Sequence, residues 1–112
     1  MLKRYKIPDC PVEAILMLVG DHWRIWIIGD LLTGTKRFGE LKKSLKTISQ
    51  KTLTEHLRFM EEYGLISRKI YAEVPPKVEY SLTKLGKSLI PIYDAMRKWG
   101  DSFKNGEFQE DN

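Results

Sequence analysis

The sequence SQKTLTEHLRFMEEYG (Ser49–Gly64) has the pattern of one amphipathic helix with defined ends. Ser49 can cap the helix N-terminus by accepting from a free backbone N–H, and Gly64 suits a left-handed stop. Leu53, Leu57 and Met60 follow i, i+4, i+7 spacing, so one side of the helix is expected to face a core. The pattern predicts a helix over residues 49–63.

The opposite side of this helix is polar and carries Gln50, Lys51, Thr54, Glu55 and Arg58. A face of this kind is most often simply solvated. It can also meet an acidic surface that offers hydrogen-bond acceptors, such as nucleic acid. The segments before and after the helix decide between these interpretations.

Bulk composition limits the class of protein. A chain of 112 residues with ordinary apolar and charged fractions is expected to form one domain with a real core. No apolar run reaches the roughly 18 residues of a membrane span, and we see no secretion leader, so we expect a cytoplasmic protein. The single cysteine excludes an internal disulfide and a cysteine-rich zinc site.

Positive charge is concentrated in the middle of the chain. The net charge is only +4, but residues 36–77 contain ten Lys or Arg against five Asp or Glu. Such a local excess is typical of a surface that binds phosphates. The end of the chain, residues 105–112, is acidic and polar, and we expect it to fray.

A short helix precedes the Ser49 helix. Phe38, Leu41, Leu45 and Ile48 share one stripe, and Lys46-Thr47-Ile48 then forms a three-residue link. Two helices joined by a tight turn, the second with a polar outward side, are typical of a helix-turn-helix.

The period changes from 3.6 to 2 after Gly64. Residues 66–71 and 77–82 alternate as strands do, and Val74-Pro75-Pro76 is expected at the tip of a hairpin. A helix-turn-helix followed by a hairpin over residues 65–82 is a winged helix. The predicted fold is therefore mainly α with a small β-hairpin (α+β).

The two ends of the chain carry more apolar surface than one small domain can bury. Residues 11–19 are almost wholly apolar, and the last helical region, 84–103, repeats apolar residues at +4 and +3. Thr83 is expected to cap this region and Pro91 to interrupt it near residues 88–90. We predict dimerisation helices at 11–19 and 84–103, with these interface residues: Ile15, Leu18, Ile92, Met96, Trp99 and Phe103.

Several fragments together resemble the HxlR-type winged-helix transcriptional regulators, a bacterial and archaeal family. They span roughly residues 10–100, and the most distinctive are GDHW at 20–23, GTKRFGEL at 34–41, ISQKTLT at 48–54 and VPPKVEYSLT at 74–83. The resemblance implies a homodimer that binds an inverted-repeat operator in double-stranded DNA through a winged helix, with the first and last helices at the dimer interface. One departure is Asp21-His22, where the family often has Gly-Lys.

The candidate DNA contacts lie on the predicted helix, the wing and the segment before the short helix. Gln can pair with adenine and Lys or Arg with guanine, while Ser and Thr suit phosphates. The predicted set is Lys36, Arg37, Ser49, Gln50, Lys51, Thr52, Thr54, Arg58, Lys69 and Lys77. For Arg68 two interpretations stay open: a DNA contact, or an ion pair with a neighbouring acid such as Glu79.

Cys10 is expected at the N-terminus of the 11–19 helix, near Arg4 and Lys6. Thiols in such positions tend to be reactive, and several members of the resembled family sense oxidants or electrophiles through a cysteine here. The alternative is a small residue that only caps or packs at the dimer interface. Both interpretations remain open.

We find no spacing that suggests a catalytic triad, a carboxylate pair, a phosphate-binding glycine loop or a metal site, so we expect neither an enzyme nor a cofactor. The sequence favours a homodimeric, sequence-specific transcriptional regulator, controlled by Cys10 thiol chemistry or by a small ligand at the dimer interface. The alternative is a winged-helix protein-interaction module whose basic face meets an acidic partner.

Overall fold

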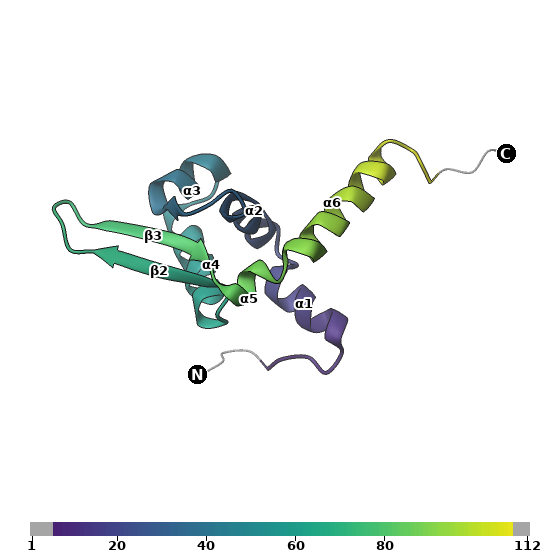
Figure 1. Ribbon diagram of the computed structural model, residues 1–112, viewed down its shortest axis with the longest axis horizontal. Coiled ribbons are helices and arrows are strands. Elements are labelled where there is room, and N and C mark those ends of the chain that lie inside the picture. The colour runs from purple at the N-terminus through teal and green to yellow at the C-terminus, as the bar shows by residue number, and fades with distance from the viewer. Residues whose placement is uncertain (1–5, 109–112) are drawn as a thin grey trace.

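A computed structural model describes residues 6–108. The elements in chain order are α1 (Pro11–Val19), α2 (His22–Leu31), β1 (Lys36–Arg37), α3 (Phe38–Leu45), α4 (Gln50–Glu62), β2 (Ile66–Tyr71), β3 (Lys77–Leu82), α5 (Lys84–Lys87) and α6 (Ile90–Lys104). Figure 1 shows α2, α3 and α4 gathered beside a long hairpin, with α6 extending to the opposite side. The predicted fold class, a winged helix-turn-helix with a small sheet, is confirmed.

The helix ends follow the local signals in the sequence. Ser49 accepts from the backbone N–H of Thr52 at 3.0 Å and caps α4. The Asp21 carboxylate accepts from two backbone N–H groups at the start of α2, at 2.8 and 3.3 Å. Gly64 has φ +79°, the left-handed conformation that ends α4 and turns the chain into β2.

The sheet has three strands, in the order β1-β3-β2, and all neighbours are antiparallel. The expected hairpin is formed by β2 and β3, with Arg68 opposite Tyr80 and Tyr71 opposite Lys77. The prediction omitted β1, in which Lys36 pairs with Tyr80. Two residues are too few to show the alternation by which a strand is recognised.

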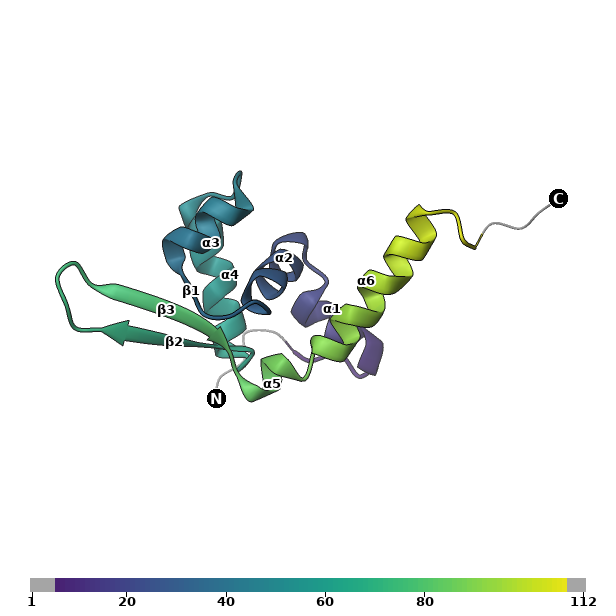
Figure 2. The same ribbon diagram turned by 45° about the horizontal axis from the view of Figure 1, so that its top comes forward.

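The core lies between helices α2, α3 and α4 and the base of the hairpin. Ile27, Leu41, Leu53 and Met60 have no exposed side-chain surface, and the predicted apolar side of α4 therefore faces inward. This packing leaves the polar side of α4 on the surface, beside the hairpin (Figure 2).

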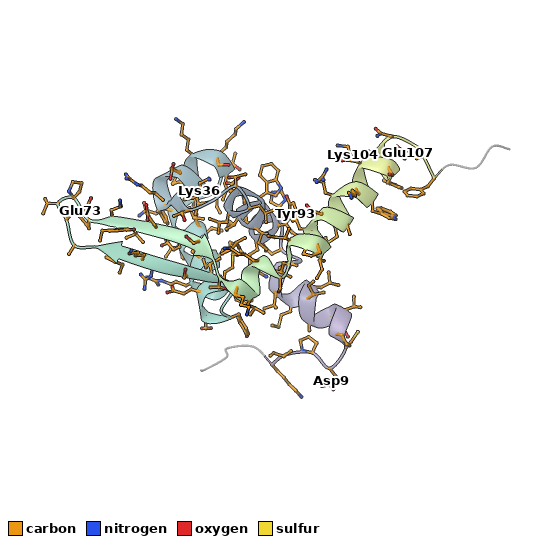
Figure 3. All side chains as sticks on the ribbon, in the orientation of Figure 1. Asp9, Lys36, Glu73, Tyr93, Lys104 and Glu107 are labelled. Atoms are coloured by element: carbon orange, nitrogen blue, oxygen red, sulfur yellow. The ribbon has the colours of Figure 1, made fainter. Side chains whose placement is uncertain are left out.

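The chain after β3 forms two helices that meet where Pro91 predicts a break. Thr83 caps α5 by accepting from the Gly86 N–H at 3.0 Å, and α6 begins at Ile90. Tyr93, labelled in Figure 3, lies where α6 meets α2. The contact is close, because a Cβ atom added to Gly29 of α2 would lie 2.7 Å from the Tyr93 hydroxyl oxygen. The first turns of α6 thus pack on α2.

The far end of α6 differs from the expected frayed tail. Residues 105–108 form turns, and the Phe108 ring stacks on Trp99 at 5.5 Å between centroids, an aromatic contact that holds the segment against α6. Residues 109–112 lie outside the described part of the chain.

The apolar surface of α1 is oriented differently from the prediction. Ile15 and Leu18, predicted at a dimer interface, are partly buried and pack against the core of their own chain. The exposed apolar residues are Val12 and Leu16, which are 64% and 54% exposed. Because nearly every residue of α1 is apolar, its sequence has no polar stripe that would reveal which side faces solvent.

Candidate nucleic-acid interface

The polar side of α4 forms one open surface. Gln50, Lys51 and Arg58 are exposed, Thr54 is half-buried, and together with Glu55 they line a wide hollow. The structure therefore brings four of the predicted DNA contacts together on one helix face. Amide, hydroxyl, ammonium and guanidinium groups at this spacing are the donors that read base edges and phosphates.

The two hydroxyl residues at the start of α4 have a structural role in the cap. Ser49 Oγ accepts from the Thr52 N–H and donates to Thr52 Oγ1, both at 3.0 Å. The predicted phosphate contacts of Ser49 and Thr52 remain a prediction. They would form beside backbone N–H groups at the positive end of the helix dipole, which also attract anions.

The cations before α3 lie on β1. Lys36 Nζ donates to Thr33 Oγ1 at 2.8 Å, while the Arg37 N–H donates to Glu40 Oε1 at 2.8 Å at the start of α3. Arg37 and Lys77 both line a hollow of about 420 Å³ between α3 and the hairpin tip. Glu73, labelled in Figure 3, lies at that tip and also lines the hollow.

The predicted wing cations belong to one cluster on a single face of the hairpin. The Lys69 and Lys77 ammonium groups lie 4.9 and 4.2 Å from the centroid of the Tyr71 ring. The Tyr71 hydroxyl donates to Glu79 at 2.8 Å, and Glu79 is also 3.8 Å from Lys77. These contacts hold both lysines on one face of the wing.

Arg68 lies on the other face of the hairpin because successive side chains of a strand alternate. Its Nε is 3.4 Å from Glu61 Oε1 of α4, so the structure shows the ion pair with a neighbouring acid, but the acid is Glu61 and not the suggested Glu79. Glu79 is on the Lys69 face and cannot reach Arg68. The ion pair instead joins the base of the wing to the helix that carries the candidate base contacts.

Sequence reasoning missed Arg24, whose guanidinium connects α1 to α4. Nε donates to the Leu18 carbonyl at 2.8 Å and Nη2 to the Met17 carbonyl at 3.0 Å. Nη1 lies 3.0 Å from His56 Nδ1, and the guanidinium stacks 4.2 Å above the Phe59 ring. We call these contacts the Arg24 clamp. The only signal of this role in the sequence was the position of Arg24, which lies one helical turn before Ile28 and therefore on the core side of α2.

His56 is held in a defined tautomer by this clamp. A guanidinium can only donate, so Nδ1 accepts and the proton is on Nε2, which lies 3.5 Å from Asp21 Oδ1. Burial lowers the pKa of His56; Asp21 acts in the opposite direction, Arg24 lowers the pKa further, and Glu55 raises it. The neutral imidazole is thus the form that fits the clamp.

Cys10 is exposed and stands at the N-cap of α1, where its side chain makes no capping hydrogen bond. The side chain therefore does not cap α1, while a reactive thiol and a small residue packed at the dimer interface both remain predictions. Arg4, which the sequence places nearby, lies outside the described residues. Within residues 6–108, no three His, Cys, Asp or Glu side chains gather in a way that would hold a metal ion.

Comparison with known proteins identifies the family. The family model described as HxlR-like helix-turn-helix matches residues 18–108. The chain belongs to this family. The HTH-type transcriptional regulator YdeP of Bacillus subtilis (strain 168) is 44% identical to this HxlR-like chain over 96 residues, which is 86% of the chain and 75% of the relative.

Two redox-related regulators are among the similar solved structures. The redox regulator HypR in its reduced form has a TM-score of 0.82 and 41% identity, covering 85% of this chain and 94% of its own. The reduced form of YodB from B. subtilis has a TM-score of 0.76 and 37% identity, covering 86% and 95%. The HxlR-like chain is thus a helix-turn-helix transcriptional regulator and not an enzyme, and its resemblance to the family is confirmed. Within residues 6–108, no helix combines the length and apolar character needed to cross a bilayer.

Proposed function

We propose that this regulator binds an inverted-repeat operator as a homodimer, in the cytoplasm, with α4 in the major groove and the wing on the backbone or minor groove. The observation that carries the proposal is the open polar side of α4 beside a cationic hairpin. A duplex would meet α4 and the wing together because both lie at the same end of the molecule (Figure 1). Two copies would read half-sites about one helical turn, or a multiple, apart.

Exposed apolar residues on α1 and α6 support the homodimer. On α6, Ile92, Met96, Trp99 and Phe103 are 42 to 62% exposed, and on α1 Val12 and Leu16 are also exposed. Contiguous exposed apolar surface of this kind is typical of an interface. Trp99→Asp would place a charge in it and should yield a monomer in sedimentation equilibrium, whereas Lys98→Glu on the same helix should remain dimeric.

Direct DNA binding is tested with duplexes selected from a random pool. Fluorescence anisotropy should show a steep salt dependence on the selected duplex and weaker binding to a scrambled one. Arg58→Ala should cost about 1 kcal/mol or more in operator affinity if Arg58 contacts a base or a desolvated phosphate. Equal affinity for selected and scrambled duplexes would favour the protein-interaction module instead.

We also propose that thiol chemistry at Cys10 controls operator binding. Exposure of the thiol at the start of α1 supports this, as does the similarity to HypR, a redox regulator solved in reduced and oxidised forms. Operator binding should change on treatment with diamide and recover with dithiothreitol, and Cys10→Ser should abolish the response. If operator binding by the wild type does not change with diamide, control through the Cys10 thiol is excluded and control by a small-molecule effector is favoured. A hollow of about 260 Å³ beside Ile25, Tyr93 and Met96 is where such an effector would bind.

A further inference from the structure

A second polar groove lies between α4 and the sheet, separate from the cation cluster on the outer face of the wing. It has a volume of about 240 Å³. The polar residues that line it are Gln50, Thr54, Arg58, Glu61, Arg68 and Tyr80. We call it the α4–β2 groove. None of the predicted wing contacts, Lys69 and Lys77, belongs to it.

The groove is continuous with the candidate base-reading surface. Gln50, Thr54 and Arg58 recur every four residues along one side of α4 and line both the groove and the open hollow. The nine residues from Gln50 to Arg58 span about 12 Å of helix. A DNA strand that contacts the start of α4 would therefore find the groove along its path toward the wing.

The chemistry of the groove suits a phosphate diester. Arg58 and Arg68 supply two guanidinium groups, one from α4 and one from β2. Burial raises the pKa of Tyr80, with Arg68, Glu61 and Arg58 as the charges that act on it, so its hydroxyl keeps its proton at neutral pH and can donate. Phosphate oxygens accept from all three groups.

Glu61 is the one carboxylate in the groove, and it holds Arg68 through a single contact of 3.4 Å. The two side chains are 36% and 45% exposed. An ion pair this open to solvent is weak, because water screens it. A phosphate that offers two oxygens to the Arg68 guanidinium can therefore replace the carboxylate.

We propose that the α4–β2 groove binds a backbone phosphate of the DNA through Arg68 and Arg58, and that Glu61 holds Arg68 in place until the phosphate displaces it. This inference rests on the proposed DNA binding and adds a phosphate contact at the base of the wing. Arg68 acts on the backbone, so its contribution does not depend on base sequence.

The first test is anisotropy titration of the full chain on selected and scrambled duplexes across a range of salt concentrations. Arg68→Ala should reduce the slope of log K against log salt by about 1 and weaken both duplexes alike. Glu61→Gln should strengthen binding to both duplexes, because Arg68 no longer has to break an ion pair with a carboxylate before it binds the phosphate. The matched control is Arg97→Ala, which removes the same charge from the exposed Arg97–Asp101 pair on α6 and should leave the slope unchanged.

The second test identifies the phosphate. Methylphosphonate groups, which are uncharged, replace the operator phosphates one at a time. One position should weaken wild-type binding about tenfold more than it weakens binding by Arg68→Ala, which still has Arg58; this difference corresponds to a coupling of about 1.4 kcal/mol.

The outcomes separate the two proposals. If the wild type shows no salt-dependent duplex binding, the proposed function fails. If the wild type binds but Arg68→Ala keeps the full salt slope, or no methylphosphonate position couples to Arg68, the groove inference alone is overturned. A groove used by a free phosphorylated ligand would also show no such coupling.

Discussion

Removing the guanidinium of Arg24 should destabilise the domain by several times the cost of removing a surface arginine. Arg24→Met keeps most of the side-chain stem and deletes the two donors to the Leu18 and Met17 carbonyls, the contact with His56 and the stacking on Phe59. A buried hydrogen bond from a charged group contributes about 1.5–3 kcal/mol.

The expected loss in free energy of unfolding is smaller than the sum of these full hydrogen-bond contributions. The two carbonyls belong to the last turn of α1 and can regain water, so we assign each about 1 kcal/mol, with about 1 kcal/mol more for the unpaired His56 nitrogen. The total is about 3 kcal/mol, which corresponds to a fall in Tm of about 13 °C for a domain of this size.

Urea and thermal unfolding at one fixed protein concentration measure this loss, because dimerisation would make stability depend on concentration. Arg97→Met is the matched control: its ion pair with Asp101 is 3.6 Å long between side chains that are 55% and 62% exposed, so its loss should cost less than about 0.5 kcal/mol. A loss below about 1 kcal/mol for Arg24→Met would refute the clamp as a source of stability.

Three further predictions concern the clamp, the turn before α4 and the turn after β3. Because the folded protein lowers the pKa of His56, the contribution of His56 to stability is complete above the unfolded value of about 6.5 and is lost as the pH falls through the folded value. His56→Gln should therefore lose less stability than the wild type between pH 7.5 and 5.5 in urea titrations, and equal losses would contradict the preference of the folded state for the neutral imidazole. Lys46 has φ 58°, so Lys46→Gly should gain about 1 kcal/mol in free energy of unfolding relative to Lys46→Ala, which keeps the strain but loses the same charge. Gly86→Ala should cost at least about 2 kcal/mol in the same assay because the new methyl group would overlap the Leu65 carbonyl oxygen, whereas Gly39→Ala, at a position with open space, should not.

Local signals in the sequence predicted the fold well because each has a short-range physical cause. Ser49, Asp21 and Thr83 cap their helices through hydrogen bonds that span two or three residues. Gly64 ends α4 because it adopts positive φ without a steric penalty. The polar side of α4 followed from its period, since a helix that buries one side must expose the other.

The parts that were missed depend on which residues meet across the fold. Arg68 pairs with Glu61 and not Glu79 because α4 packs on its face of the sheet, which no spacing in the sequence reveals. The side of α1 that faces outward was wrong for the same reason: the residues that cover Ile15 and Leu18 come from other elements. Arg24 likewise finds its partners in α1 and α4 only once these helices are packed together.

The two connections that join α4 to its neighbours differ in strength. At one side, the Arg24 clamp joins α4 to the last turn of α1, and the exposed Cys10 is the N-cap of α1. At the other side, the solvent-exposed Arg68–Glu61 pair joins α4 to the wing. Coupling between distant sites in regulators is typically about 1–3 kcal/mol, which is comparable to the expected strength of the clamp and larger than that of an exposed ion pair. A displacement of α1 would therefore reach α4 through the clamp before it disrupted the domain, whereas the weaker pair at the wing would yield first when a phosphate binds.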